Sequence, residues 1–100
     1  MSREVSRAEL RRRRAAGEDV LVVDVRAPEE FAASHIEGAV NVPLEEIEAD
    51  PSRLPLGRSL VCVCGKGGGR SERAARALQE ARAVDVGFLE GGTLAWLAER

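Results

Sequence analysis

The stretch LVCVCGKGGGRSERAARALQEARA, residues 60–83, decides the fold, because a strand, a turn and a helix follow one another in it. Its first five residues, 60–64, form a short apolar run, which is typical of a strand buried on both faces of a sheet. Alanine and leucine recur at helical spacing in residues 71–83 and predict a helix with one apolar face. A strand that passes through a glycine turn into a helix indicates an α/β protein.

The remainder of the chain alternates between the same two kinds of element. Further helices are predicted at residues 6–16, 28–34, 44–50 and 93–99, and further strands at residues 20–25, within 35–43 and near 84–89. Ser6 and Glu9 have the spacing of a capping box, and Pro28 suits the first turn of the second helix. We expect an α/β fold with one domain over residues 1–100, built on an open, twisted, mostly parallel sheet with helices on both faces.

The composition limits the partners that the chain can have. The 100 residues carry a formal net charge of -2, and no apolar run approaches the roughly 18 residues of a membrane span. We expect no binding to nucleic acid or membranes, and we interpret the arginine run at residues 11–14 as a solvated helix face. The charged start of the chain is unlike a secretory signal, and Cys62 and Cys64 are too close in sequence to staple distant segments. These features favour a cytoplasmic protein with free thiols.

The glycine-rich segment does not fit the common binding loops. A nucleotide phosphate loop would need glycine at the position of Cys64 and lysine at that of Arg70. A dinucleotide fingerprint would need glycine at the position of Arg70 as well. A zinc site from Cys62, Cys64 and His35 lacks a fourth ligand and the usual spacing, so we expect no metal.

A nucleophile beside an anion-binding loop accounts for the whole segment. Glycines let backbone N–H groups turn inward, and the following helix directs its positive end to the same place. Cys64 is therefore predicted to be a catalytic nucleophile that is largely thiolate near neutral pH. The predicted anion-binding residues are Gly65, Lys66, Gly67, Gly68, Gly69, Arg70 and Ser71. The simpler alternative is a tight turn that follows a small buried Cys64; Cys62, inside the strand, is expected to pack in the core.

Three motifs stand out along the chain: DVRAPEEFAASHIEGAVNVP at residues 24–43, CGKGGGRS at 64–71 and LEGGTLAW at 89–96. In sequence and in order, they resemble the motifs of the rhodanese family in its single-domain form. The resemblance implies the rhodanese-like fold and sulfur transfer. Cys64 would attack the outer sulfur of a donor such as thiosulfate, release sulfite and carry the sulfur as a persulfide to cyanide, a small thiol or a protein. It implies neither a metal nor an organic cofactor.

The resemblance also suggests roles for residues around the loop. By position, Asp24 and Arg26 look like a charged pair that supports the loop. Lys66 matches no family motif, but it is expected to contact the substrate anion. His35 is expected to be a hydrogen-bonded structural residue, because an ionised thiol needs no base. Trp96 is expected to pack in the core or over its edge.

The loop departs from the family pattern in one respect. Five residues separate Cys64 from Arg70, where the family usually has four. Cys-x5-Arg is the spacing of cysteine-dependent phosphatases, including cell-cycle phosphatases with the rhodanese fold, and of related arsenate reductases. Phosphate ester cleavage benefits from a general acid, however, and the loop interior supplies none. Thiosulfate sulfurtransferase is our first interpretation; a phosphatase or arsenate reductase, a non-catalytic sulfur-carrier or interaction module, and a redox disulfide between the two cysteines stay open.

Overall fold

The computed structural model describes residues 3–99 and contains one five-stranded sheet. The strand order is β1-β5-β4-β2-β3, and every neighbouring pair is parallel. The strands are β1 (Arg3–Val5), β2 (Val20–Asp24), β3 (Val40–Asn41), β4 (Ser59–Val63) and β5 (Asp85–Leu89). The α/β class and the parallel sheet that the sequence predicts are confirmed.

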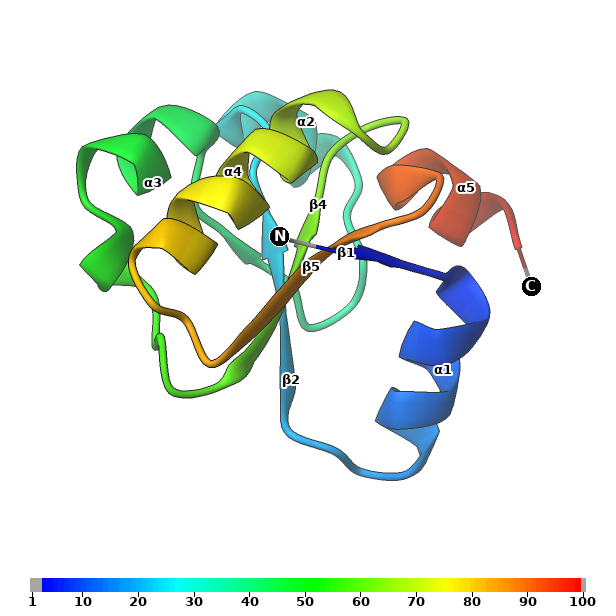
Figure 1. The fold of residues 1–100 in the computed structure, drawn as a ribbon. Coiled ribbons are helices and arrows are strands. Elements are labelled where there is room, and N and C mark those ends of the chain that lie inside the picture. The colour runs from blue at the N-terminus through cyan, green and yellow to red at the C-terminus, as the bar shows by residue number, and fades with distance from the viewer. Residues whose placement is uncertain (1–2, 100) are drawn as a thin grey trace.

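Helices lie on both faces of this sheet (Figure 1). They are α1 (Arg7–Ala15), α2 (Pro28–Ala33), α3 (Leu44–Ala49), α4 (Gly69–Glu80) and α5 (Gly92–Ala98), with a short 3-10 helix η1 (Pro51–Arg53). The helices α2, α3 and α4 lie on one side of the sheet in Figure 1, whereas α1 and α5 lie on the other. None of the helices within residues 3–99 is long and apolar enough to cross a membrane.

The central strand β4 divides the core into two parts. Leu60 and Cys62 belong to the cluster of buried side chains beneath α3 and α4. Val61 and Val63 belong to a second cluster, which packs against α1 and Trp96 of α5. These four side chains of β4 are buried, because successive strand residues point to opposite faces and both faces are covered. The prediction of a doubly buried strand, with Cys62 in the core, is confirmed.

Both ends of α4 differ by two or three residues from the sequence-based prediction. The helix α4 begins at Gly69 rather than Ser71. The Gly68 carbonyl already accepts a hydrogen bond from the Ser71 amide at 3.0 Å, so loop residues form the first turn of the helix. It also ends at Glu80 rather than at residue 83. The edge strand β1 was not predicted; with three residues it is too short for any periodicity to be visible.

The arginine run is not only the solvated face that we predicted. The Arg11 guanidinium lies 4.7 Å from the centre of the Trp96 ring, and that of Arg14 lies 5.9 Å from it. Arg11 also pairs with Glu99, at the end of α5. The cation–π contacts and the ion pair join α1 to α5. Part of the run is therefore a contact between two helices, and Trp96 packs at the edge of the core, as expected.

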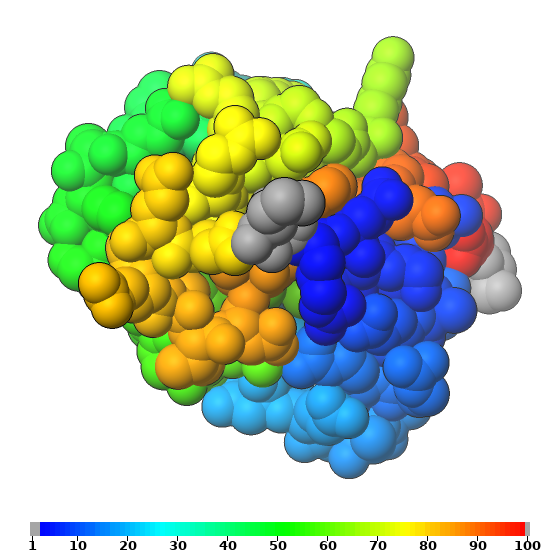
Figure 2. All heavy atoms as spheres, in the orientation of Figure 1, coloured from blue at the N-terminus to red at the C-terminus, as the bar shows by residue number. Residues whose placement is uncertain are grey.

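The two ends of the described chain lie against one another. The Glu90 amide donates to the Val5 carbonyl at 2.8 Å, and the Arg7 side chain pairs with Glu99. Figure 2 shows the N-terminal residues, in blue, in contact with the C-terminal residues, in orange and red.

Candidate active site

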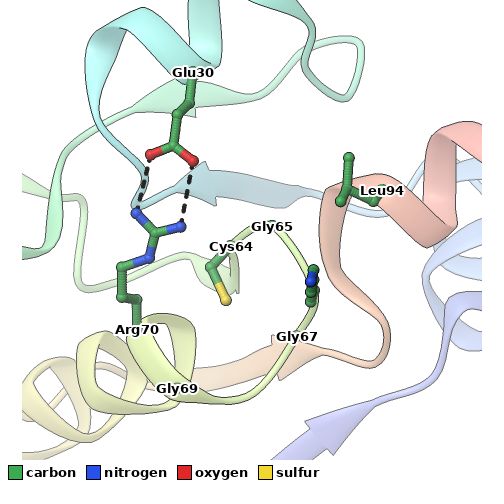
Figure 3. Close-up of a pocket in the computed structure, with 8 residues that line it drawn as sticks. Glu30, Cys64, Gly65, Gly67, Gly69, Arg70 and Leu94 are labelled. Atoms are coloured by element: carbon green, nitrogen blue, oxygen red, sulfur yellow. Dashed lines mark hydrogen bonds and ion pairs between the residues drawn. The ribbon is translucent and has the colours of Figure 1, made fainter.

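The glycine-rich loop borders a pocket at the carboxyl ends of the parallel strands, which is where open α/β sheets bind their ligands. The pocket has a volume of about 430 Å³. Figure 3 shows its lining, which consists of Glu30, Cys64, Gly65, Lys66, Gly67, Gly69, Arg70 and Leu94. Six of the predicted site residues therefore line one pocket. Gly68 and Ser71 are outside this lining but contact the Cys64 sulfur, and Asp24 and Arg26 are not part of it.

The Cys64 thiol is almost buried, with 4% of the residue exposed. Its Sγ lies 3.2 Å from the Gly68 carbonyl oxygen and 3.3 Å from the Ser71 hydroxyl, which itself donates to that carbonyl at 2.8 Å. These contacts fit a protonated thiol that donates to an oxygen. We expected N–H groups of the loop to turn toward the sulfur; at Gly68 a carbonyl faces it instead.

Arg70 is engaged by a residue that the sequence analysis did not single out. Its Nη1 lies 3.0 Å from Oε1 of Glu30 and its Nη2 lies 3.4 Å from Oε2. Glu30 comes from the first turn of α2, and its Oε1 also accepts the Ala27 amide at 3.2 Å. The Arg70 guanidinium, followed by the Ala27 amide, holds the pKa of Glu30 below its ordinary value. Glu30 therefore places a carboxylate at the pocket.

Lys66 places a second cation at the pocket, and its surroundings differ from those of Arg70. It is exposed, lines the pocket and forms no ion pair with any residue in the described part of the chain. Because an ammonium on a flexible stem is a mobile point charge, Lys66 can follow an anion across the pocket. Its position is compatible with the predicted contact to a substrate anion.

Asp24 and Arg26 form a buried ion pair beside the site. The Arg26 Nη2 donates to Asp24 Oδ2 at 2.8 Å and to the Ser34 carbonyl at 2.7 Å, and the Arg26 amide donates to Asp24 Oδ1 at 3.0 Å. Asn41 Nδ2 donates to the backbone carbonyls of both residues at 3.0 Å. Because the pair fixes the chain that precedes and follows α2, its geometry is compatible with a supporting role.

The other residues weighed in the sequence lie outside the pocket lining. His35 stacks on Phe31, with 3.8 Å between ring centres, and its Nδ1 lies 2.8 Å from the Phe31 carbonyl. This agrees with the structural role expected for His35. Burial raises the pKa of Cys62 from 9.0 to about 12, so its thiol is protonated at neutral pH. Residues 3–99 contain no cluster of three or more His, Cys, Asp or Glu side chains that could share a metal.

The helix α5 holds the loop through backbone hydrogen bonds. The Thr93 amide donates to the Cys64 carbonyl at 2.8 Å, and the Leu94 amide donates to the Gly65 carbonyl at 3.0 Å. A β-carbon on Gly92 would overlap the Cys64 carbonyl oxygen and would lie 2.5 Å from the Gly67 nitrogen. The motif at residues 89–96 was visible in the sequence, but its contact with the loop depends on the folded arrangement.

Comparison with known proteins assigns the chain to a family. Residues 6–99 match the family described as the rhodanese-like domain. A sulfurtransferase of Allochromatium vinosum is 36% identical over 96 residues, which cover 96% of this chain and 89% of that protein. The human single-domain sulfurtransferase TSTD1 superposes with a TM-score of 0.84 at 29% identity and covers 100% of this chain and 99% of the human one.

A third relative is a larger protein. The HTH-type transcriptional regulator Rv0324 of Mycobacterium tuberculosis is 42% identical over 94 residues, which are 92% of this chain but only 40% of that protein. The same kind of domain therefore also occurs as a part of longer proteins. From the match over residues 6–99 and the likeness to single-domain relatives, we conclude that this chain belongs to the rhodanese-like domain family.

Proposed function

We propose that this protein is a sulfurtransferase that carries a sulfane sulfur from a thiosulfate-type donor to a thiophilic acceptor as a persulfide on Cys64. The observation that carries the proposal is the placement of Cys64, the one thiol in the pocket lining, within a glycine-rich loop followed by a helix. Membership of a family that includes named sulfurtransferases supports the same chemistry. A small thiol, cyanide or a protein thiol would be the acceptor. The cytoplasmic location stays a prediction.

In the first step the Cys64 thiolate attacks the outer sulfur of the donor. A bond forms between Sγ and this sulfur, and the bond to the sulfonate sulfur breaks, so that sulfite leaves with the electron pair. The proton of the resting thiol is lost to solvent before the attack. Once it is lost, the Ser71 hydroxyl, which lies 3.3 Å from Sγ, can turn from the Gly68 carbonyl and donate to the thiolate.

In the second step the acceptor nucleophile attacks the outer sulfur of the persulfide. The sulfur–sulfur bond breaks, and its electron pair returns to Sγ, which restores the thiolate. The helix α4 directs its N-terminus at the loop, and this favours the thiolate in both steps. The chemistry needs no metal or organic cofactor.

The ionisation of Glu30 argues against the alternative function, the hydrolysis of phosphate esters. A leaving alcohol needs a proton, and Glu30 is the one carboxyl group in the pocket lining. Because Arg70 lowers its pKa, Glu30 is ionised at neutral pH and is a poor proton donor. Sulfite is a stable anion and leaves without a proton. The spacing of five residues between Cys64 and Arg70 is the feature that still favours a tetrahedral oxyanion as the substrate.

The test compares the wild-type protein with Cys64→Ser and Cys62→Ala. After incubation with thiosulfate, intact-protein mass spectrometry should show one added sulfur atom in the wild type and in Cys62→Ala, and none in Cys64→Ser. The first two should then form thiocyanate from cyanide with turnover, which a non-catalytic carrier would not do. Hydrolysis of an aryl phosphate or reduction of arsenate, without any persulfide, would reject the proposal.

A further inference from the structure

The geometry of the Glu30–Arg70 pair is that of an arginine bound to an anionic ligand. Two guanidinium nitrogens face two carboxylate oxygens, at 3.0 and 3.4 Å. Arginine binds oxyanions through the same two parallel hydrogen bonds. In Figure 3 the guanidinium of Arg70 points toward Glu30, and the Cys64 sulfur lies beside the Arg70 side chain, to its right. The carboxylate thus occupies the face of Arg70 with which an incoming anion would pair.

Glu30 is held in this position from a second direction. Its Oε1 accepts the Ala27 amide at 3.2 Å, a bond that fixes the side chain over the start of α2. The nearby Arg26 guanidinium also lowers the pKa of Glu30 and so keeps it ionised. Glu30 is the one residue of α2 in the pocket lining. The carboxylate therefore lines the pocket with two hydrogen-bond partners, Arg70 and the Ala27 amide, although 43% of its side chain is exposed.

We propose that Glu30 determines the anion selectivity of the loop by competing with the substrate for Arg70. While Glu30 pairs with Arg70, Lys66 is the one unpaired cation among the residues that line the pocket. An oxyanion must then displace the Glu30 carboxylate, or share Arg70 with it, before it can bind to the arginine. The inference rests on the anion-binding role of the loop in the proposed function, and it assigns Glu30 as a positioning residue that acts through Arg70.

The experiment measures anion binding without relying on turnover. Cys64 is alkylated with iodoacetamide in increasing concentrations of inorganic sulfate or phosphate, which do not react with the thiol, and the concentration that halves the rate is recorded. Glu30→Gln should lower this concentration about three- to fivefold, the factor that corresponds to breaking an exposed ion pair. Glu29→Gln is the matched control: it removes the same charge from the next position of α2, from an exposed residue outside the pocket lining. It should leave the half-protection concentration close to the wild-type value.

A second pair of variants tests whether Glu30 acts through Arg70. In an Arg70→Gln background the further change Glu30→Gln should no longer tighten anion binding. The inference is wrong if Glu30→Gln weakens protection, if it has no more effect than Glu29→Gln, or if it tightens binding equally without the arginine. In turnover, Glu30→Gln should lower KM for thiosulfate and leave kcat close to its wild-type value. If the wild-type protein formed no persulfide, but Glu30→Gln still lowered the half-protection concentration, the proposed function would be rejected and this inference would be retained.

Discussion

Cys62 and Cys64 are two residues apart on the same face of the sheet, but one thiol lies in the core and the other lies at the pocket. Cys62 is fully buried in the core beneath α3 and α4. Cys64 follows the last residue of β4, where the sheet ends and the pocket begins. A thiol in apolar surroundings, such as that of Cys62, loses the solvation of its charged form. The sequence could separate the two because one lies inside the strand and the other at its end.

The buried Cys62 thiol makes the stability of the protein fall in alkaline solution. Burial raises its pKa from 9.0 to about 12, so above pH 9.0 the unfolded chain releases this proton while the folded chain keeps it. The stabilisation is complete below the unfolded pKa and is lost as the pH rises through the folded one, with roughly 2 kcal/mol gone at about pH 10.5. Urea unfolding at about pH 8 and about pH 10.5 should show the cost of Cys62→Ala shrinking by about this amount. A cost that is independent of pH would contradict the assignment.

The helix α5 also determines the position of the loop. The amides at the start of α5 donate to the Cys64 and Gly65 carbonyls, so the position of the sulfur depends on α5. Gly92 permits this approach for two reasons. Its φ of +66° is in the left-handed region, and a β-carbon there would meet the loop backbone.

Gly92→Ala should therefore destabilise the protein and displace the loop. Gly17→Ala is the matched control, because Gly17 also has a positive φ of +74° but a β-carbon there would meet nothing within 4 Å. Both changes carry the left-handed strain of about 1–2 kcal/mol, and Gly92→Ala should cost about 1–3 kcal/mol more through overpacking. Hydrogen exchange should show faster loss of the Thr93 and Leu94 amide protons in Gly92→Ala alone. Equal behaviour of the two variants would mean that α5 does not hold the loop.

The parts of the site that the sequence predicts are those that are contiguous in it. The loop from Cys64 to Ser71 follows a strand and starts a helix, so its place at the end of the sheet follows from local pattern. Glu30 reaches the same pocket from α2, and no local pattern tells which way its side chain turns. The edge strand β1 was missed for a related reason, since its pairing with β5 involves residues at opposite ends of the chain.

On the scale of the whole molecule, the sheet separates two cores that share only the strands between them. Ile47 of α3 lies in the cluster on one face, and Ile36 lies in the cluster on the other. Both side chains have 0% exposure, and each packs against side chains of its own cluster. Residues without shared partners usually contribute independently to the free energy of unfolding.

Ile36→Val and Ile47→Val should therefore destabilise the protein additively. Each change removes one buried methylene group and should cost about 0.5–1.5 kcal/mol. Urea unfolding of the two single variants and the double variant should give a coupling free energy below about 0.5 kcal/mol. The m-value should be unchanged, because a cooperative sheet unfolds both cores together. A coupling above about 1 kcal/mol would show that the strands transmit packing changes between the faces, and a reduced m-value would show that one core can open alone.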